Sequence, residues 1–249
     1  MNLSGLKQDW EDLAALDPLW AILSDPRYQH QNWDLGAFFL TGEHEIEGLV
    51  ATARGLAYPK IWHRSLDFGC GVGRLTRALA RYFEECFGVD ISETMIGLAG
   101  QMNGSVPNCR FFRHVEPNLK IFPENHFDLV YTSIVLQHLP KPEWIRSYIQ
   151  EFLRVLAPGG LLVFQLPSWI RLRNRVQPRR RLYRFLRILG LDRRFLYEKL
   201  GLVPIVMNFI PEEEVVAYLR ERSGRILLVE ADSSAPPGVK SRRYYLTKP

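Results

Sequence analysis

The residues that could do chemistry are concentrated in one glycine-rich segment, Leu66-Asp67-Phe68-Gly69-Cys70-Gly71-Val72-Gly73-Arg74. The segment follows a short apolar run and precedes a helical pattern, so it predicts a turn from a strand into a helix. Glycines at such a turn tolerate positive φ and let the backbone approach a ligand closely. The spacing is GxGxG, whereas the dinucleotide fingerprint GxGxxG needs a glycine where Arg74 stands. The segment therefore indicates a nucleotide-like ligand, although not through the dinucleotide pattern.

Two carboxylates accompany this turn. Asp67 stands two residues ahead of Gly69, and Asp90 ends the next apolar run, 19 residues after Gly71. In a doubly wound sheet, an acid at the second of these places can accept hydrogen bonds from both hydroxyls of a ribose. The alternative is that Asp90 only serves the dipole of the helix that follows, a contribution of ~0.3–1 kcal/mol. The glycine turn upstream favours the ribose interpretation.

Alternating strands and helices must position these residues. The expected strands are 61–68, 85–89, 109–113, 127–132, 161–166, 225–230 and 242–247, and the expected helices include 74–83, one capped by Ser92, and two that begin at Pro142 and Pro211. Repeated β–α units with continuous apolar strands predict a parallel sheet that is covered on both faces. The last two strands are joined by the turn-rich segment 233–238, which predicts a closing hairpin and hence one antiparallel strand.

Two segments lie outside this alternation. In residues 1–60 we expect helices around 9–16, 17–23 and 43–53, which form a helical N-terminal cap before a main domain of residues 61–249. Within the cap, the segment 38–43 could close over a bound ligand. Residues 167–210 form an insertion of about 44 residues, far longer than the ~2–6 residues of ordinary βα loops.

The charge of the chain is unevenly distributed. Of its 249 residues 47% are hydrophobic and 24% charged, which excludes a disordered chain and a disulfide scaffold. Residues 170–200 hold ten arginines and Lys199 against Asp192 and Glu198, a balance of +9, while the net charge of the chain is +5. The remaining residues sum to −4, so the chain is not a uniformly basic nucleic-acid binder.

Hydropathy and the spacing of cysteines and histidines bear on the location of the protein and on metal binding. No apolar run approaches the ~18–20 residues of a membrane-spanning helix, and the first residues lack the basic and apolar regions of a secretory signal. Three cysteines without CxxC spacing indicate reduced thiols and a cytoplasmic location. The histidines form no HxxxH or HxH pair with a carboxylate, so we expect no metal site.

In their order and spacing, four parts of the chain resemble the class I S-adenosylmethionine-dependent methyltransferases, specifically the broad small-molecule, type 11-like subgroup. They are 66–73, 88–92, 127–130 followed by Leu136-Gln137-His138-Leu139, and 153–160. The resemblance covers residues 61–166 and implies S-adenosylmethionine as the cofactor. It also implies an α/β fold with a doubly wound, Rossmann-like sheet of seven strands, mostly parallel with one antiparallel strand near the C-terminus. It leaves the methyl acceptor open.

The resemblance further implies roles for individual residues. Asp67 would face the methionine amino group, Asp90 would hold the ribose diol and Ile91 would pack on the adenine. Glu116 would reach the adenine amino group, although Pro117 after it has no N–H to offer the adenine ring. The residues that would line the methionine and ribose through their backbone are Gly69, Cys70, Gly71, Gly73, Thr132 and Ser133.

His138, six residues past the end of the expected strand 127–132, is the candidate general base. Methyl transfer depends mainly on positioning, and only a hydroxyl or thiol acceptor would clearly need a base. The alternative is a structural histidine whose ring nitrogens are satisfied by the backbone.

The basic insertion admits several interpretations. In 181–191 the apolar residues 182, 185, 186 and 189 share a helical face flanked by arginines. The segment 171–194 could be an amphipathic lid packed on the domain, a site for an anionic acceptor, or a contact with an anionic membrane surface. We expect a small or carrier-linked, anionic acceptor. The alternatives are an RNA methyltransferase, disfavoured by the acidic remainder, and a membrane- or partner-docking protein on this fold. The sequence does not indicate an oligomeric state.

Overall fold

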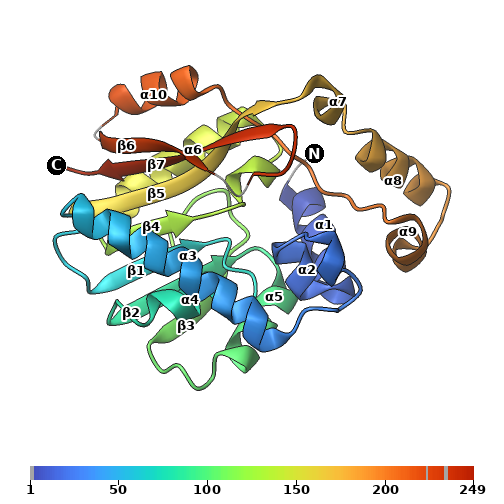
Figure 1. The fold of residues 1–249 in the computed structure, drawn as a ribbon, viewed down its shortest axis with the longest axis horizontal. Helices are drawn as coiled ribbons and strands as arrows, with labels where there is room; N and C mark the ends of the chain where they lie inside the picture. Colours follow the sequence, from blue (N-terminus) through green and yellow to red (C-terminus); the bar gives the residue numbers. More distant parts are fainter. Residues whose placement is uncertain (1–2, 223, 233–234) are drawn as a thin grey trace.

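A seven-stranded sheet forms the centre of the computed structural model, which describes residues 3–222, 224–232 and 235–249 (Figure 1). The strands are β1 Arg64–Phe68, β2 Glu85–Asp90, β3 Cys109–Arg113, β4 Phe127–Thr132, β5 Leu156–Ile170, β6 Arg225–Asp232 and β7 Val239–Thr247. Their order is β3-β2-β1-β4-β5-β7-β6, and β7 runs antiparallel to both of its neighbours. The predicted α/β fold, a mostly parallel doubly wound sheet of seven strands with one antiparallel strand near the C-terminus, is confirmed.

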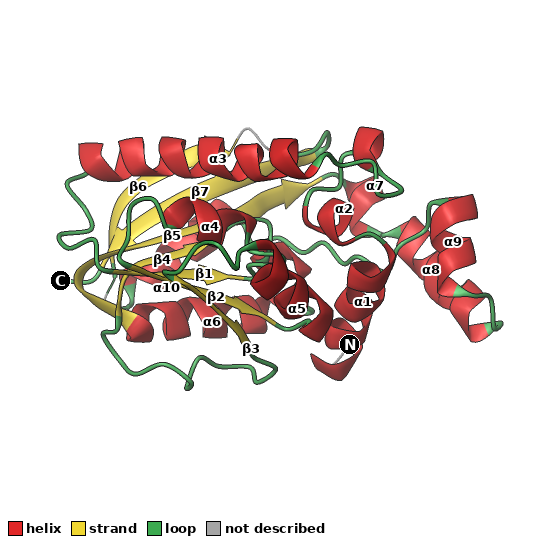
Figure 2. Ribbon diagram, turned by 90° about the horizontal axis from the view of Figure 1, so that it is seen from below, coloured by secondary structure: helices red, strands yellow, loops and turns green. Residues whose placement is uncertain are grey.

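Helices cover both faces of this sheet. They are α1 Leu3–Leu16, α2 Pro18–Ile22, α3 Leu35–Gly55, α4 Arg74–Leu79, α5 Glu93–Met102, α6 Pro142–Val155, α7 Leu172–Arg175, α8 Pro178–Ile188, α9 Arg193–Leu200 and α10 Glu212–Arg220. Figure 2 shows α3 along one face and α6 along the other. The two faces follow from the period of two along a strand. On β4, Val130 packs with the cluster of α6 and α10, whereas Leu129 and Tyr131 pack with the cluster of α3 and α4.

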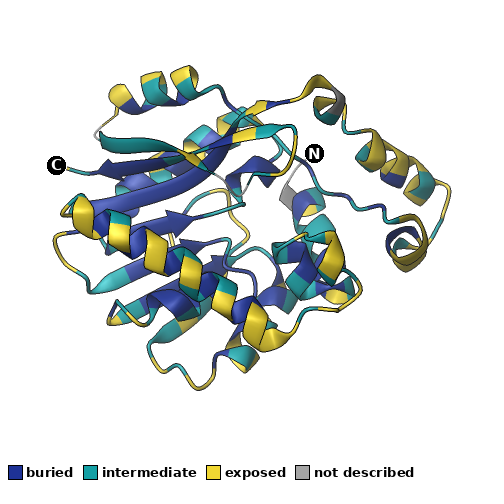
Figure 3. Ribbon diagram, viewed as in Figure 1, coloured by how far each residue is buried: buried dark blue, intermediate teal, exposed yellow. Residues whose placement is uncertain are grey.

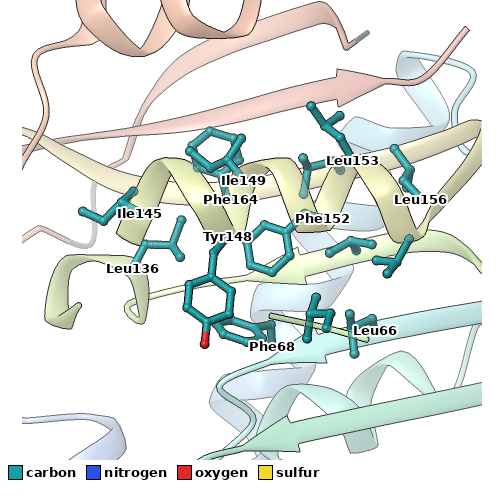
Figure 4. Packing of buried hydrophobic residues seen from close by; sticks show 14 of the residues in the cluster. Leu66, Phe68, Leu136, Ile145, Tyr148, Ile149, Phe152, Leu153, Leu156 and Phe164 are labelled. Carbon is teal, nitrogen blue, oxygen red and sulfur yellow. The ribbon is translucent and has the colours of Figure 1, made fainter. Parts of the chain in front are cut away.

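The core under α6 extends to the edge of the sheet where the candidate site lies. The ring centroid of Phe68, the last residue of β1, lies 4.8 Å from that of Tyr148 and 5.0 Å from that of Phe152, both on α6 (Figure 4). Burying aromatic rings of this size is among the largest apolar contributions that a side chain makes. The end of β1, where the glycine turn begins, is therefore held on a rigid support.

The N-terminal helices divide into two groups. α1 and α2 lie beside the carboxyl edge of the sheet, but α3 covers a face of the sheet itself, with Ile46 and Leu49 packed against Tyr131 on β4 and Leu79 on α4. α3 begins at Leu35 because Asp34 caps it, accepting a hydrogen bond from the Ala37 amide. α3 thus covers a face of the sheet, whereas α1 and α2 lie at its edge. The division of the chain at residue 60 stays a prediction.

Several expected boundaries differ in the structure. β1 begins at Arg64 instead of residue 61, β5 begins at Leu156 instead of residue 161, and β7 begins at Val239 instead of residue 242. α4 ends at Leu79 instead of 83, because the Asn108 side chain donates hydrogen bonds to the carbonyls of Ala80 and Phe83 and ends the helix there. β5 continues to Ile170, which pairs with Val239 on β7, so the insertion begins four residues later than 167. We call residues 171–200, which carry α7, α8 and α9, the arm. In Figure 1 the arm projects from the body beside α1 and α2.

Candidate active site

The glycine turn after β1 has the geometry that its composition predicts. Gly69 and Gly71 have φ of +77° and +53°, in the region that favours glycine. A Cβ on Gly69 would lie 2.4 Å from Cγ2 of Val135, and one on Gly71 would lie 2.5 Å from Cδ1 of Ile22. No side chain fits at either position. The turn is therefore a bare backbone surface between the sheet and the N-terminal helices.

Asp90 closes the other side of this turn. Its Oδ2 accepts a hydrogen bond from the Gly71 amide at 2.9 Å, and its Oδ1 accepts one from the Ser92 amide at 2.9 Å. Burial raises the pKa of this carboxyl group, although both amide hydrogen bonds act to lower it. A carboxylate has about four lone-pair positions, so each oxygen can still accept a hydrogen bond from a ligand. The structure thus holds Asp90 in an orientation that suits two neighbouring hydroxyl groups.

A pocket at the carboxyl edge of the sheet unites most of the predicted residues. Gly69, Cys70, Gly71, Asp90, Ile91, Ser133 and His138 all line it. Burial raises the pKa of the Cys70 thiol well above its ordinary value, so this residue is a small protonated side chain in a tight turn and not a nucleophile.

Part of the wall of this pocket comes from residues that the sequence did not identify. Leu6 and Trp10 on α1, with Ala21 and Ile22 on α2, line the pocket. The segment 38–43 does not, because Phe38 and Phe39 are buried in the core of the cap instead. The only sequence signal for α1 and α2 was their amphipathic pattern, which shows that a helix packs but not where.

The adenine end of the predicted site also differs. His114 lines the pocket, and its Nε2 lies 2.6 Å from the carbonyl oxygen of Asn118, which can only accept, so the ring proton is on Nε2. Glu116 is exposed and is absent from the described pocket wall. Its contact with the adenine amino group is not tested by these positions. His114, which lines the pocket, is the alternative residue for that end and the one that we favour.

Asp67 lies beneath the glycine turn rather than in the pocket. Successive side chains of a strand point to opposite faces, and Phe68 occupies the pocket side, so Asp67 points towards α4. There its Oδ2 accepts a hydrogen bond from Thr76 Oγ1 at 2.6 Å. Gly73 and Thr132 likewise do not line the pocket in the described structure, and Thr132 Oγ1 donates to the Phe68 carbonyl at 2.9 Å. The proposed contact of Asp67 with the methionine amino group stays a prediction.

The burial of Asp67 gives the first testable prediction. Burial raises the pKa of Asp67 to about 7, although Thr76 and Arg74 act to lower it. A raised folded pKa favours the protonated form, so this contribution to stability is complete below pH ~4 and is lost as the pH rises towards 7. Asp67→Asn stays neutral, so its free energy of unfolding should rise relative to the natural protein by about 2–3 kcal/mol between pH 4.5 and 6.5. Urea unfolding at both pH values measures this, and a difference that does not change with pH would contradict it.

Arg74, which stands where a dinucleotide fingerprint has glycine, joins α4 to α3. Its Nη2 lies 2.8 Å from Glu45 Oε2, and the other oxygen of Glu45 accepts a hydrogen bond from Tyr131 Oη at 2.7 Å. Only 4% of the Arg74 side chain and 18% of the Glu45 side chain is exposed. Burial acts to raise the pKa of Glu45, but Arg74 and the hydrogen bonds outweigh it and the pKa is lowered. A buried ion pair therefore lies directly under the pocket floor, where Arg74 is one of the lining residues.

His138 is held by a chain of hydrogen bonds with a definite direction. Gln165 Oε1 accepts from the Ile134 amide at 3.0 Å, so its Nε2 faces Gln137 Oε1 at 3.4 Å, and Gln137 Nε2 then faces His138 Nε2 at 3.3 Å. At the other end, His138 Nδ1 lies 2.6 Å from the carbonyl oxygen of Val206. A carbonyl can only accept, so the proton is on Nδ1, which agrees with the direction of the glutamine chain.

Burial lowers the pKa of His138 to about 4, so the imidazole is neutral at physiological pH. Trp10 packs edge-on against it, with ring centroids 5.2 Å apart. The ring is thus fixed between the N-terminal cap and the segment that returns from the arm. The position is compatible with both interpretations of His138. The ring lines the pocket, as a general base would, and both of its nitrogens have hydrogen-bond partners, as in a structural histidine.

Comparison with known proteins identifies the architecture. Residues 66–164 match the family model described as a methyltransferase domain. The magnesium protoporphyrin IX methyltransferase (ChlM) from Synechocystis PCC 6803, solved with bound SAH, superposes with a TM-score of 0.64 over 99% of both chains at 18% identity. Residues 66–164 form a methyltransferase domain, and the sheet that contains them has the fold of the class I S-adenosylmethionine-dependent methyltransferases. The resemblance seen in the sequence is thereby confirmed.

The sequence relatives share this domain rather than the whole length. An uncharacterized methyltransferase, YcgJ, of Bacillus subtilis is 32% identical over 100 residues, which cover 39% of this chain and 38% of that protein. A trans-aconitate 2-methyltransferase of Deinococcus radiodurans is 35% identical over 105 residues, covering 41% of this chain and 37% of that protein. The chain thus matches about two fifths of the length of these curated relatives. The glycine turn and Asp90 lie within residues 66–164, which match the family model.

Neither a metal centre nor a membrane-spanning helix is found within the described residues. Among residues 3–222, 224–232 and 235–249, no group of three or more histidine, cysteine, aspartate or glutamate side chains is arranged to hold a metal ion. Within the same residues, none of the helices has the length and hydropathy needed to cross a bilayer.

Proposed function

We propose that this protein is an enzyme that transfers a methyl group from S-adenosylmethionine to a small molecule with an apolar or aromatic body. The observation that carries the proposal is one pocket, lined by the glycine turn and Asp90 and also by Leu6, Trp10 and His138. We assign the lining at the glycine turn and Asp90, the first part, to the nucleoside of the cofactor. We assign the lining at Leu6, Trp10 and His138, the second part, to the acceptor.

The residues of the first part fit the cofactor. Asp90 presents two fixed oxygens to a ribose diol, Ile91 and Met95 offer apolar surface for a base, and the positive φ of Gly69 leaves room for the methionine portion. When bound, the sulfonium supplies an electrophilic methyl group for in-line attack by a nucleophile. The relatives solved with SAH, ChlM and the N-methyltransferase NodS, share this fold.

The residues of the second part position the acceptor and exclude water. Holding two reactants in line can contribute about 7–11 kcal/mol to the rate, so no covalent nucleophile is needed from the chain. His138 is neutral and places no positive charge beside a sulfonium. Its Nε2 carries a lone pair, so it can accept a proton from a hydroxyl acceptor that displaces the Gln137 amide, although a pKa near 4 makes it a weak base.

The apolar lining changes the expectation for the acceptor. Among the described residues Arg74 is the one arginine in the pocket wall, and it is already paired with Glu45. The arginines of the insertion lie outside. An anionic group or carrier on the acceptor can therefore contact the arginines of the insertion only if it extends out of the pocket. The part that is methylated lies inside, against Trp10 and Leu139.

The test is a methyl-transfer screen with labelled S-adenosylmethionine against fractionated metabolites. We expect transfer to acceptors with an aromatic or apolar body, and a drop of at least about tenfold in kcat/KM for the acceptor in Trp10→Ala, because this change removes the largest ring of the second part. The Kd for the cofactor should change much less. Cofactor binding without transfer to any fraction would contradict the proposed activity, and transfer confined to short RNA would replace the acceptor class.

A further inference from the structure

The arm, residues 171–200, exposes an apolar strip. Along α8 the side chains of Leu182, Phe185, Ile188 and Leu189 face solvent, and Ile188 is 83% exposed. Leu172 and Val176 on or beside α7 and Phe195 on α9 are also exposed. In Figure 3 the arm is coloured mostly as exposed, in contrast to the buried strands. Exposed apolar side chains gathered on one element are typical of an interaction surface.

The strip is not needed to fold the arm. The sequence pattern places residues 182, 185, 186 and 189 on one apolar face, but in the structure only Leu186 of these packs inward. Tyr183 joins Leu196 and Leu202 in a separate small core, and Leu186 packs against it. The other three side chains are left outside. The arm thus has its own core on one side of α8 and an unpartnered apolar face on the other.

Arginines border this face. On a helix, residues four apart lie on the same side, so Arg181 lies beside Phe185 and Arg184 beside Ile188. Both arginines are exposed. The two acids of the arm are Asp192, which caps α9, and Glu198, which lies 3.3 Å from Arg194. Two acids of α1 also face the arm: Asp9 lies near Arg184, and Asp12 pairs with Arg193. These four acids are fewer than the ten arginines of the arm, so positive charge remains in excess around the strip.

The arm is also tied to the pocket wall. Arg193 at the start of α9 forms an ion pair with Asp12 on α1, and Tyr197 Oη donates a hydrogen bond to Asp17, the cap of α2, at 2.7 Å. The Trp20 ring on α2 lies 5.4 Å from the Tyr197 ring. α1 and α2 supply one wall of the pocket. A surface that binds the arm would therefore also restrain α1 and α2, which form that wall of the pocket.

We propose that the strip on α8 docks onto the surface of a bilayer rich in anionic lipids, with α8 lying in the plane of the headgroups. An apolar face flanked by arginines is the pattern of an interfacial helix, because the apolar side chains enter the acyl boundary while the guanidinium groups bind lipid phosphates. α8 spans 11 residues, about 16 Å, which suits a surface contact and not a span. RNA would use the arginines but would leave Ile188 and Phe185 exposed to water. The proposal concerns a surface outside the pocket and does not depend on methyl transfer.

The test is flotation of the full chain with vesicles of phosphatidylcholine alone or with 30% phosphatidylglycerol. We expect binding to the anionic vesicles only, weakened by salt. Ile188→Glu and Leu182→Glu should each reduce the partition coefficient at least about tenfold, because each places a carboxylate at the acyl boundary. The matched control is Leu40→Glu on α3, because Leu40 and Leu182 are each 47% exposed, and it should leave binding unchanged.

The arginines have a separate test. Arg181→Ala and Arg184→Ala should each weaken binding to anionic vesicles about fivefold, whereas Arg54→Ala, an exposed arginine on α3, should not. Equal binding to neutral vesicles, or no binding to either, would overturn the proposal. So would salt-sensitive binding of short RNA that is unaffected by Ile188→Glu, or a self-association that this variant abolishes in the absence of lipid. Circular dichroism of each variant shows that the helices remain folded.

Discussion

Asp90→Ala is expected to weaken the binding of S-adenosylmethionine by roughly a thousandfold. Hydrogen bonds to a charged group contribute about 1.5–3 kcal/mol each, and Asp90 is oriented to accept two from a ribose. The change also leaves the amides of Gly71 and Ser92 without their acceptor, so the turn itself loses support. Isothermal titration calorimetry with the cofactor measures the change in Kd.

Two further variants separate these contributions. Asp90→Asn keeps one acceptor oxygen and should have an intermediate affinity. Glu116→Ala removes an exposed carboxylate that does not line the pocket, and its Kd should stay within about twofold of the natural value. If Asp90→Ala bound the cofactor as tightly as the natural protein, the ribose assignment would have to be abandoned. If Glu116→Ala lost affinity instead, the adenine end would have to be placed at Glu116 and not at His114.

Glu45→Gln is expected to destabilise the fold by about 3–5 kcal/mol, because it leaves the buried Arg74 without its counter-charge. The Arg74 Nε atom has no hydrogen-bond partner among the described residues, so the guanidinium depends heavily on this carboxylate. Glu45 also accepts a hydrogen bond from Tyr131 Oη, and the side-chain oxygen of the glutamine can still accept this bond. The measurement is the free energy of unfolding in urea.

The chain offers a matched control for this variant. Arg81 and Glu43 form another α3 ion pair at 2.8 Å, but in a largely exposed position. Glu43→Gln should cost less than about 1 kcal/mol, because water screens the exposed pair. The double variant Glu45→Leu with Arg74→Met should be less destabilised than Glu45→Gln alone, since it leaves no buried guanidinium without its carboxylate partner. Similar losses at Glu45 and Glu43 would contradict the role of burial.

The variant Glu45→Gln also separates two functions of Arg74, binding in the pocket and stabilising α4. The residue lines the pocket and supports α4, so a variant that unfolds cannot reveal a role in binding. Glu45→Gln leaves the guanidinium in place. Cofactor affinity that survives in this variant at low temperature would assign the ion pair to stability, and a parallel loss of affinity would show that the pair also orients the pocket floor.

Much of the fold could be predicted because its determinants are local and periodic. The strands 109–113 and 127–132 were predicted at their observed bounds, and Ser92 caps α5 as expected, accepting a hydrogen bond from the Met95 amide. Such patterns repeat every two or 3.6 residues and need no knowledge of the rest of the chain. One antiparallel strand near the C-terminus followed from the same units together with the resemblance, whereas the order of the strands was not predicted.

The position of Asp67 was accessible to the same reasoning but was assigned by resemblance instead. Phe68 and Leu66 belong to the apolar cluster on one face of the sheet, so the residue between them faces the other side. Its hydrogen bond to Thr76 then depends on how α4 packs. Alternation along the strand thus indicated the direction, while tertiary structure decided the partner.

The sequence alone determined the glycine turn, the acid at the end of the second strand and the alternation that places both at one edge of a parallel sheet. Only the tertiary structure decided that α1 and α2 would form a wall of the pocket, that burial would keep His138 neutral while Val206 fixes the proton on Nδ1, and that α8 would turn Ile188 to solvent. These features depend on contacts between residues that are distant along the chain. An amphipathic pattern shows that a helix has an apolar face, but the surface that covers this face is set by the packing of the whole molecule.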